Sequence, residues 1–284
     1  MKTDIGRLFD LSGKRAAITG GGGELCGTMA EALSALGVKV AILDIDPKAA
    51  QLRQDAIVAA GGIARAMSCN VLDEAELEGC YSQICELWGG IDLLINGAGG
   101  NSRAGSTDRE FLEPEDFGND GLQGFFNLPF AGFKQTFDLN FFGTFLPLKI
   151  LTRGMAERHS GSIVNVSSMS AFTPLTKVGA YSAAKAAVAN FTQWLAVHFS
   201  HVGVRVNAIA PGFFMTEQLR FLHIDEKTGE YTPRAKKVVA HTPMGRYGDP
   251  EELLGTVIWL LSDASRFVTG NVVPIDGGYS SYTV

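Results

Sequence analysis

The sequence predicts an α/β fold, with a doubly wound parallel sheet covered by helices on both faces. Short runs rich in β-branched residues alternate with longer helical patterns, which is typical of parallel strands joined by crossover helices. A glycine-rich turn follows the first run and an acid ends the second, as in the first crossover unit of such a sheet. At 284 residues the chain fits one large domain, and we expect residues 1–284 to form it.

Six runs are expected to form strands, and the segment between the first two is expected to form a helix. In that segment Leu25, Met29, Leu33 and Leu36 recur at helical spacing, and Gly37 then ends the helix. Residues 15–44 are therefore predicted to be one strand–helix–strand unit, with residues 19–27 (TGGGGELCG) at its first turn. The expected strands are residues 16–19, 38–43, 91–96, 162–167, 204–209 and 272–275.

Two long segments interrupt this alternation. Residues 100–135 mix glycine, proline, acids and phenylalanines without sustained periodicity, and residues 213–248 are polar and basic. Loops of this length are usually functional or disordered. We expect both to be substrate-side insertions of the same domain, because no linker or repeat divides the chain.

The composition excludes several classes of protein. Hydrophobic residues make up 46% and charged residues 19% of the chain, as in an ordinary globular protein. The net charge of −6 gives no electrostatic footprint for nucleic acid or membrane, and no stretch reaches the roughly 18 apolar residues of a membrane span. We expect a cytoplasmic protein that binds neither. Cys26, Cys69, Cys80 and Cys85 lack metal-ligand spacing, so we expect buried free thiols and no metal site.

The glycine-rich turn predicts a phosphate-binding site, although it departs from the usual templates. Gly20 to Gly23 offer unhindered backbone N–H groups where a helix begins, and the helix dipole also favours an anion there. Neither G-x-G-x-x-G nor G-x-x-x-G-x-G fits any register, because Glu24 and Cys26 stand where glycine is expected. We expect Glu24 to point away from the phosphates and Cys26 to replace a glycine in helix-to-sheet packing, at some cost in separation.

Asp44 ends the second expected strand, about 20 residues past the turn. An acid there is the expected partner of the ribose hydroxyls of NAD, and it would repel the additional phosphate of NADP. We therefore predict NAD, with NADP less favoured. The alternative reading is a solvated residue at the end of a strand.

The strongest catalytic signal lies in residues 162–191. Tyr181 and Lys185 are four residues apart in an alanine-rich helical segment, so they share one face, and Ser168 follows an expected strand. A phenol with an ordinary pKa of about 10 is a poor base, but a neighbouring ammonium group favours the phenolate. Tyr181 could then exchange a proton with an alcohol or ketone, and Ser168 could hydrogen-bond the reacting oxygen. A surface Tyr–Lys pair on an amphipathic helix is the alternative.

These residues resemble the short-chain dehydrogenase/reductase family, from LSGKRAAITG at residue 11 to VPIDGGYS at residue 273. The resemblance implies a Rossmann fold and a catalytic set of Asn140, Ser168, Tyr181 and Lys185. In this set Lys185 would also hold the nicotinamide ribose, and Asn140 would help to position a proton-relay water. INGAG at residues 95–99 stands where the family has NNAG, and Asn70 stands where it has Asp.

The resemblance also implies the wider cofactor contacts. Asn70, Val71, Asn96, Ala98 and Gly99 are expected on the adenine side, and Pro211, Gly212 and Thr216 near the nicotinamide carboxamide. The full expected set is Gly20, Gly22, Gly23, Glu24, Leu25, Asp44, Ile45, Asn70, Val71, Asn96, Ala98, Gly99, Tyr181, Lys185, Pro211, Gly212, Phe214 and Thr216.

The two insertions, with AFTPLTKVGAYS, NFTQWLAVHFS and APGFFMTE, resemble the D-mannonate oxidoreductases of the short-chain type, also called fructuronate reductases. This implies a sugar-acid substrate whose carboxylate needs a local cation, for which Arg103, Lys177 and Arg220 are candidates. Asn101 and Ser170 could bind its hydroxyls.

Several alternatives stay open. For each of the three candidate cations a solvated surface charge is the favoured alternative, since that is the usual state of Lys and Arg. The same chemistry could act on a gluconate-type acid, a polyol or a cyclic ketone, or the protein could be a non-catalytic NAD-binding regulator. Family members are usually homotetramers, and residues 271–284 would suit an interface strand, so we predict a tetramer.

Overall fold

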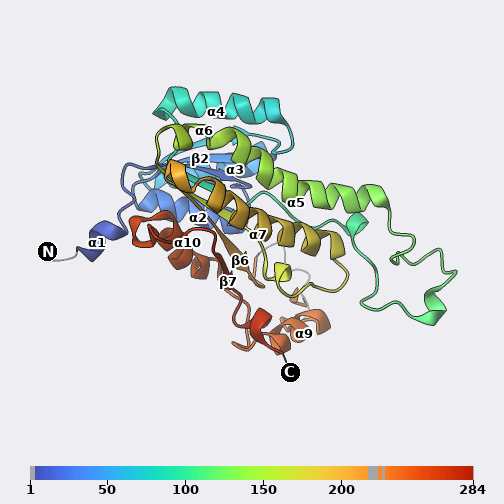
Figure 1. The fold of residues 1–284 in the computed structure, drawn as a ribbon. Coiled ribbons are helices and arrows are strands. Elements are labelled where there is room, and N and C mark those ends of the chain that lie inside the picture. Colours follow the sequence, from blue (N-terminus) through green and yellow to red (C-terminus); the bar gives the residue numbers. More distant parts are fainter. Residues whose placement is uncertain (1–3, 217–222, 226–227, 284) are drawn as a thin grey trace.

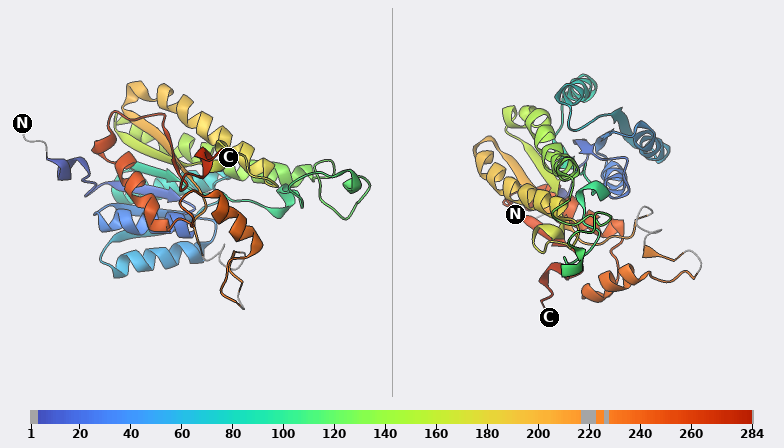
Figure 2. Two further views of the ribbon diagram at one scale, coloured as in Figure 1. Left: turned by 90° about the horizontal axis from the view of Figure 1, so that it is seen from below. Right: turned by 90° about the vertical axis from the view of Figure 1, so that its right-hand side faces the viewer.

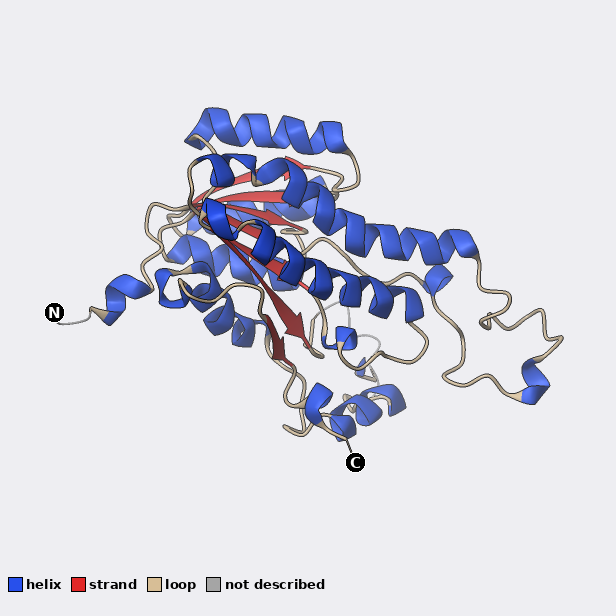
Figure 3. Cartoon of the chain, in the orientation of Figure 1, coloured by secondary structure: helices blue, strands red, loops and turns tan. Residues whose placement is uncertain are grey.

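A seven-stranded parallel sheet with the strand order β3-β2-β1-β4-β5-β6-β7 forms the centre of the protein (Figures 1 and 3). This is a computed structural model that describes residues 4–216, 223–225 and 228–283. The strand order reverses between β1 and β4, and ligands of such sheets bind at that reversal, outside the carboxyl ends of the strands. The strands are β1 (Arg15–Thr19), β2 (Lys39–Asp44), β3 (Ile63–Ser68), β4 (Leu93–Asn96), β5 (Gly161–Val166), β6 (Val204–Pro211) and β7 (Val272–Ile275).

Helices cover both faces of the sheet, as predicted (Figure 2). One apolar core joins the sheet to α2, α3 and α10, and a second joins it to α4, α5 and α7. Within the described residues no helix combines the length and apolarity of a membrane span. The helices are α1 (Ile5–Leu8), α2 (Glu24–Ala35), α3 (Pro47–Ala59), α4 (Glu74–Trp88), α5 (Phe130–Leu151), α6 (Arg153–Glu157), α7 (Gly179–His198), α9 (Pro233–His241) and α10 (Leu254–Leu261).

Local sequence signals account for the starts of several helices. Asp46 and Asp73 cap α3 and α4 by accepting backbone N–H groups of the first turn, which would otherwise have no partner. Successive residues of β1 serve opposite faces: Ile18 lies in the core under α2, and Ala17 lies in the core under α4. The glycine-rich turn is thereby held between a fully buried strand and the N-terminus of α2.

The sequence prediction missed β3, the strand at one edge of the sheet. Its side chains alternate between exposed and partly buried, Ile63 is 52% exposed, and only Met67 is buried. The run contains Arg65 and two alanines, so it lacks the apolar signal of the strands that are covered on both faces. The other six strands lie within a few residues of the predicted ranges.

The two insertions differ from the prediction at their ends. Residues 100–129 contain two short 3-10 turns, Arg103–Gly105 and Pro114–Asp116, but residues 130–135 belong to α5. The second insertion contains α9. Thr232 is its N-cap and Pro233 its first residue, a common combination at helix starts. Of the predicted substrate residues, Arg220 lies outside the described residues.

Candidate active site

In the run Gly20–Gly23 of the glycine-rich turn, the surrounding protein leaves no room for a Cβ atom at three of the four positions. Gly20 has a φ of +66°, and a Cβ atom there would lie 2.9 Å from the backbone nitrogen of Ala98. A Cβ atom on Gly22 would lie 2.8 Å from the Cβ atom of Ala49, and Gly21 is similarly crowded. Gly23 is different, because a Cβ atom there would meet only the carbonyl oxygen of Gly20, at 3.3 Å. The protein's own packing therefore constrains residue 23 less than the three glycines before it, through one tight contact with a backbone carbonyl.

The turn has the properties of a dinucleotide phosphate site. Gly23 is the exposed N-cap of α2, so the first N–H groups of this helix point outward with the positive end of its dipole. Asp44 accepts hydrogen bonds from the backbone N–H of Gly22, at 2.9 Å, and of Asp46, at 2.9 Å. Its carboxylate thereby fixes the turn beside the end of β2, where a ribose would lie. These residues fit an NAD-type cofactor.

Cys26 stands at a helix position where the family has a glycine that lets the helix pack closely on the sheet. It is buried in α2, and its Sγ atom lies against Gly97, directly after β4. A Cβ atom on Gly97 would collide with that sulfur. The predicted packing role of Cys26 is thus confirmed, and Gly97, which stands where the family has Asn, provides the room.

Ser168, Tyr181 and Lys185 come together at the carboxyl end of β5. The Ser168 hydroxyl accepts the backbone N–H of Ser170, at 3.2 Å, and hydrogen-bonds to the Tyr181 hydroxyl. The Lys185 Nζ atom lies 5.7 Å from the centroid of the Tyr181 ring and donates to the carbonyl oxygen of Val166, at 2.8 Å. The three groups therefore face one another, as the sequence predicts.

Asn140, on α5, joins this group to the loop after β4. Its Nδ2 atom donates to the carbonyl oxygens of Gly100, at 2.6 Å, and Thr136, at 2.8 Å, and its Oδ1 atom accepts the N–H of Gly100, at 3.1 Å. A Cβ atom on Gly99 would lie 2.6 Å from Asn140 Oδ1 and 3.2 Å from Lys185 Nζ. The side chain of Asn140 thus fixes the loop after β4, which lies beside Lys185.

Burial controls the protonation of the two central groups. Burial raises the pKa of Tyr181 above its ordinary value, and the hydrogen bond with Ser168 opposes this only in part. Burial lowers the pKa of Lys185 to about 8. The prediction that Lys185 draws the phenol toward its ionised form is therefore wrong for this arrangement, because the ammonium group lies over the ring and bonds to Val166. Tyr181 is a protonated acid at neutral pH.

The remaining predicted cofactor residues line the carboxyl edge of the sheet. Asn70 accepts the N–H of Leu72, at 3.1 Å, so its side chain stabilises the turn after β3. Asn96 donates to Asn165, at 2.9 Å, and its Oδ1 atom has no protein partner among the described residues. Leu25 lies in the first turn of α2, and Ile45, Val71 and Ala98 follow β2, β3 and β4. Pro211 ends β6, and Gly212, Phe214 and Thr216 follow it. The expected orientation of Glu24, the first residue of α2, stays a prediction.

The candidate substrate residues are placed very differently. The Arg103 side chain is 93% exposed, 3.9 Å from Asp108, and Asn101 donates to Ser106, at 2.9 Å. Ser170 is buried, and its hydroxyl has no partner among the described residues. Lys177 is partly buried and has a φ of +70°, which is uncommon for a residue other than glycine.

Lys177 also connects two loops at the site. Its carbonyl oxygen accepts the N–H of Thr107, at 2.8 Å, which joins the first insertion to the loop before Tyr181. Unusual backbone conformations of this kind concentrate at functional sites. Lys177 is therefore the best-positioned of the candidate cations in the part of the protein that the structure describes.

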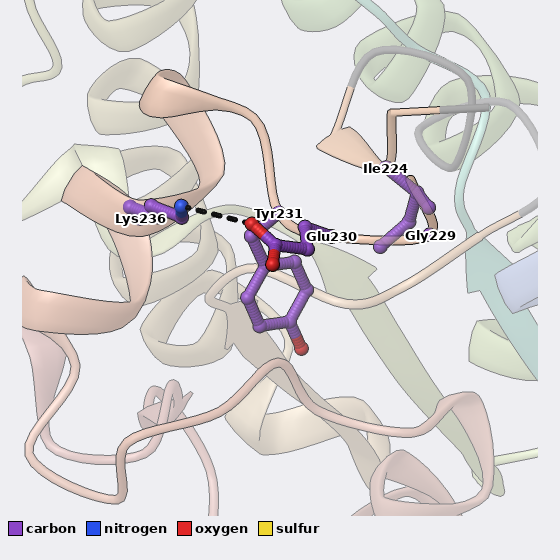
Figure 4. A pocket seen from close by; sticks show the side chains of 5 residues that line it. All are labelled: Ile224, Gly229, Glu230, Tyr231 and Lys236. Atoms are coloured by element: carbon purple, nitrogen blue, oxygen red, sulfur yellow. Dashed lines mark ion pairs between the residues drawn. The ribbon is translucent and has the colours of Figure 1, made fainter. Parts of the chain in front are cut away.

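A separate hollow of about 570 Å³ lies in the second insertion (Figure 4). Ile224, Gly229, Glu230, Tyr231 and Lys236 line it, and Glu230 and Lys236 form an ion pair at 3.5 Å. None of the predicted catalytic, cofactor or substrate residues is among these five. The hollow is therefore not the place where the reacting groups meet.

Sequence reasoning missed a buried polar network under the site. Asn165 Nδ2 donates to the Thr192 hydroxyl, at 2.9 Å, and that hydroxyl donates to the carbonyl oxygen of Val188, at 2.8 Å. Together with the bond from Asn96 to Asn165, this network ties β4, β5 and α7 together. The polar Asn165 inside the apolar run 162–167 was the signal that could have revealed it.

Comparison with known proteins agrees with this geometry. A family model described as Enoyl-(Acyl carrier protein) reductase matches residues 25–280. The chain belongs to the short-chain dehydrogenase/reductase family, and it is an oxidoreductase of CH–OH groups.

Three relatives define the neighbourhood of this protein within the family. The uncharacterized oxidoreductase UxuB of Bacillus subtilis (strain 168) is 48% identical over 275 residues, which cover 96% of this chain and 97% of that protein. A Haemophilus influenzae protein proposed to be a D-mannonate oxidoreductase, solved with NAD bound, is 44% identical, with a TM-score of 0.91 and 99% of both chains covered. A gluconate 5-dehydrogenase from Burkholderia cenocepacia, solved with NADP and tartrate, is 28% identical, with a TM-score of 0.81 and 98% and 99% covered.

Proposed function

We propose that the protein interconverts a secondary alcohol and a ketone on a sugar acid, D-mannonate and D-fructuronate, with NAD(H). The observation that carries this proposal is the meeting of Ser168, Tyr181, Lys185 and Asn140 beside a glycine-rich turn that fits a dinucleotide. The choice of a sugar acid is supported by the relatives, one proposed to act on D-mannonate and another a gluconate 5-dehydrogenase. The proposed assembly is a homotetramer and the proposed location the cytoplasm.

NAD rather than NADP is the proposed cofactor. Gly22 and Gly23 would hold its phosphates, Asp44 its adenosine ribose, and Lys185 its nicotinamide ribose. When bound, it supplies the hydride acceptor or donor of the reaction. Asp44 already carries two backbone hydrogen bonds at the end of β2, so a 2′-phosphate there would meet a fixed carboxylate.

The protein's own residues would handle the proton. Because burial keeps Tyr181 protonated at neutral pH, its hydroxyl is ready to donate to the carbonyl oxygen of a ketone. Ser168, whose oxygen accepts the N–H of Ser170, directs its own proton toward the same point and would stabilise the oxygen as charge develops. In the direction of alcohol oxidation Tyr181 would first have to release its own proton to solvent, and the resulting phenolate would then accept the proton of the alcohol.

Lys177 would hold the carboxylate of the sugar acid. Its partly buried position and left-handed backbone place a cation at the loop before Tyr181. The Lys177→Ala variant should raise the KM for a hexonate much more than for a neutral polyol, because only the hexonate loses an ion pair. Arg103→Ala is the matched control, since that side chain lies in solvent. Equal effects of Lys177→Ala on both substrates would rule out this role.

A substrate panel tests the reaction itself. D-mannonate, gluconate, a polyol and a cyclic alcohol would be compared by NADH absorbance with the wild type, Tyr181→Phe and the exposed control Tyr282→Phe. We expect the highest kcat/KM with D-mannonate, and a loss of roughly 10²–10⁴-fold in Tyr181→Phe. Full turnover in Tyr181→Phe would refute the chemistry, and a clear preference for another class would refute the substrate.

A further inference from the structure

Lys177 is held in its left-handed conformation by one hydrogen bond. Its carbonyl oxygen accepts the N–H of Thr107, at 2.8 Å, and in the part of the chain that the structure describes Lys177 has no other hydrogen bond and no ion pair. A φ of +70° is unfavourable for a residue with a Cβ atom and persists only where the surroundings hold it. The placement of the Lys177 ammonium group therefore depends on how firmly Thr107 is held.

Thr107 is fixed from both sides by a single residue, Gln123. The Nε2 atom of Gln123 donates to the carbonyl oxygen of Ser106, the residue before Thr107, at 2.6 Å. The carbonyl oxygen of Gln123 accepts the backbone N–H of Asp108, the residue after Thr107, at 2.9 Å. In return the backbone N–H of Gln123 donates to the Asp108 carboxylate, at 2.8 Å. Gln123 thus holds both neighbours of the residue that bonds to Lys177.

The side chain of Gln123 also reaches further back along the same loop. Its Nε2 atom donates to the carbonyl oxygen of Arg103, at 3.0 Å, in addition to that of Ser106. An amide –NH₂ group has two hydrogens to donate, which matches these two acceptors. A glutamate side chain has the same length but, when ionised, has no hydrogen to donate. The identity of residue 123 is therefore matched to this contact, and not only its size.

The rest of the first insertion is closed off by the same residues. Residues 109–122 leave and return between Asp108 and Gln123, which pair through two hydrogen bonds. Within this excursion the hydrogen bonds include local ones, such as the one that Asn119 Oδ1 accepts from the N–H of Gly121, at 3.1 Å. A change at Asn119 therefore alters the excursion without removing any hydrogen bond of Gln123.

We infer that Gln123 is a positioning residue for the substrate carboxylate, which it serves by holding Thr107 and, through Thr107, the backbone of Lys177. The inference deepens the proposed function and rests on the role proposed there for Lys177. A binding group that is displaced by even a small distance loses much of its contact with a ligand. Loss of the Gln123 side chain should therefore weaken the binding of a carboxylate while the proton-transfer groups stay in place.

Steady-state kinetics with D-mannonate and a neutral polyol test the inference. Gln123→Ala should raise the KM for D-mannonate at least about fivefold, and should change kcat and the KM for the polyol by less than about twofold. Gln123→Glu, which keeps the length of the side chain but loses both donated hydrogen bonds, should show the same split. Asn119→Ala is the matched control and should behave as the wild type.

Two outcomes of these measurements would overturn the inference. Wild-type constants in both Gln123 variants would show that the side chain does not position the carboxylate. Equal changes with both substrates, or a fall in kcat as large as the rise in KM, would show a general effect on the fold of the site.

A double-mutant cycle with Lys177→Ala shows whether Gln123 acts through Lys177. In the Lys177→Ala background, Gln123→Ala should change the KM for D-mannonate by less than about twofold, because the cation that it positions is already gone. A loss of about fivefold in both backgrounds would show that Gln123 acts independently and would overturn the inference alone. A Lys177→Ala variant with the wild-type KM, or a wild type that turns over no sugar acid, would overturn the proposed function and the inference with it.

Discussion

Lys185, which the proposed reaction requires, should lower the free energy of unfolding of the protein. Its side chain is buried, with the ammonium group bonded to the carbonyl oxygen of Val166, and burial lowers its pKa from an ordinary 10.5 to about 8. At about 1.4 kcal/mol for each pKa unit, this difference corresponds to roughly 3 kcal/mol of unfavourable burial. Replacing Lys185 with methionine removes this cost and loses the hydrogen bond to Val166, which contributes about 1 kcal/mol. We therefore expect Lys185→Met to raise the free energy of unfolding by about 2 kcal/mol at pH 7.

The pH dependence gives a second measurement of the same effect. Between pH 8 and 10.5 the folded protein has released the Lys185 proton but the unfolded state still binds it, so the stability of the wild type rises with pH. At pH 9 the wild type should have regained roughly 1 kcal/mol of unfolding free energy, which narrows its difference from Lys185→Met.

Urea unfolding without added cofactor, followed by tryptophan fluorescence at pH 7 and pH 9 and at one protein concentration, measures both effects. The exposed Lys48→Met is the matched control and should change stability by less than about 0.5 kcal/mol. A Lys185→Met variant less stable than the wild type at pH 7, or a difference between them that does not shrink at pH 9, would refute this reasoning. Loss of turnover together with a gain in stability would show that the lysine is present for function.

Three further predictions concern the cofactor turn. Gly23→Ala should raise the KM for NAD at least about tenfold with little change in melting temperature, because its Cβ atom would face the phosphates and not the protein, whereas Gly20→Ala should lower the melting temperature. Asp44→Ser should reduce the preference for NAD over NADP at least about tenfold in kcat/KM, and an unchanged ratio would contradict the assigned role of the carboxylate. Gly97→Ala should cost about 1–3 kcal/mol in urea unfolding through its collision with the sulfur of Cys26, and adding Cys26→Gly should restore most of it; a double variant as unstable as Gly97→Ala would disprove the contact.

The sequence predicted most of the fold because the central strands are buried on both faces. Runs such as 38–43 and 204–209 read as continuous apolar segments, and six of the seven strands were located from them. β3 has one exposed edge and carries Arg65, so it has no comparable signal. α5 begins inside a segment whose phenylalanines face solvent, and its first turn could not be distinguished from the irregular segment before it.

The sequence predicted which residues form the candidate site, but it did not predict their contacts or the direction of their pKa shifts. The spacing of Tyr181 and Lys185 indicated that they share a helix face, and the structure agrees. Spacing could not show that the ammonium group lies over the ring and bonds to Val166, nor that burial raises the pKa of the phenol. The exposure of Arg103 and the left-handed backbone of Lys177 likewise depend on how two loops meet, and no local pattern records that contact.

The glycine-rich turn connects these observations. Two of its positions, Glu24 and Cys26, depart from the family template. The close packing of α2 on the sheet is nevertheless kept, because a residue far away in the sequence accommodates Cys26. Gly97 makes room for Cys26, so α2 stays close to the end of β4, while Gly23 is the glycine of the run 20–23 that the protein's own packing constrains least. A glycine that packing constrains only weakly, at a helix N-terminus beside a fixed carboxylate, suits a ligand that approaches the backbone closely. We therefore expect Gly23 to make the phosphate contact of the proposed cofactor, and the Gly23→Ala measurement is the most direct test of this expectation.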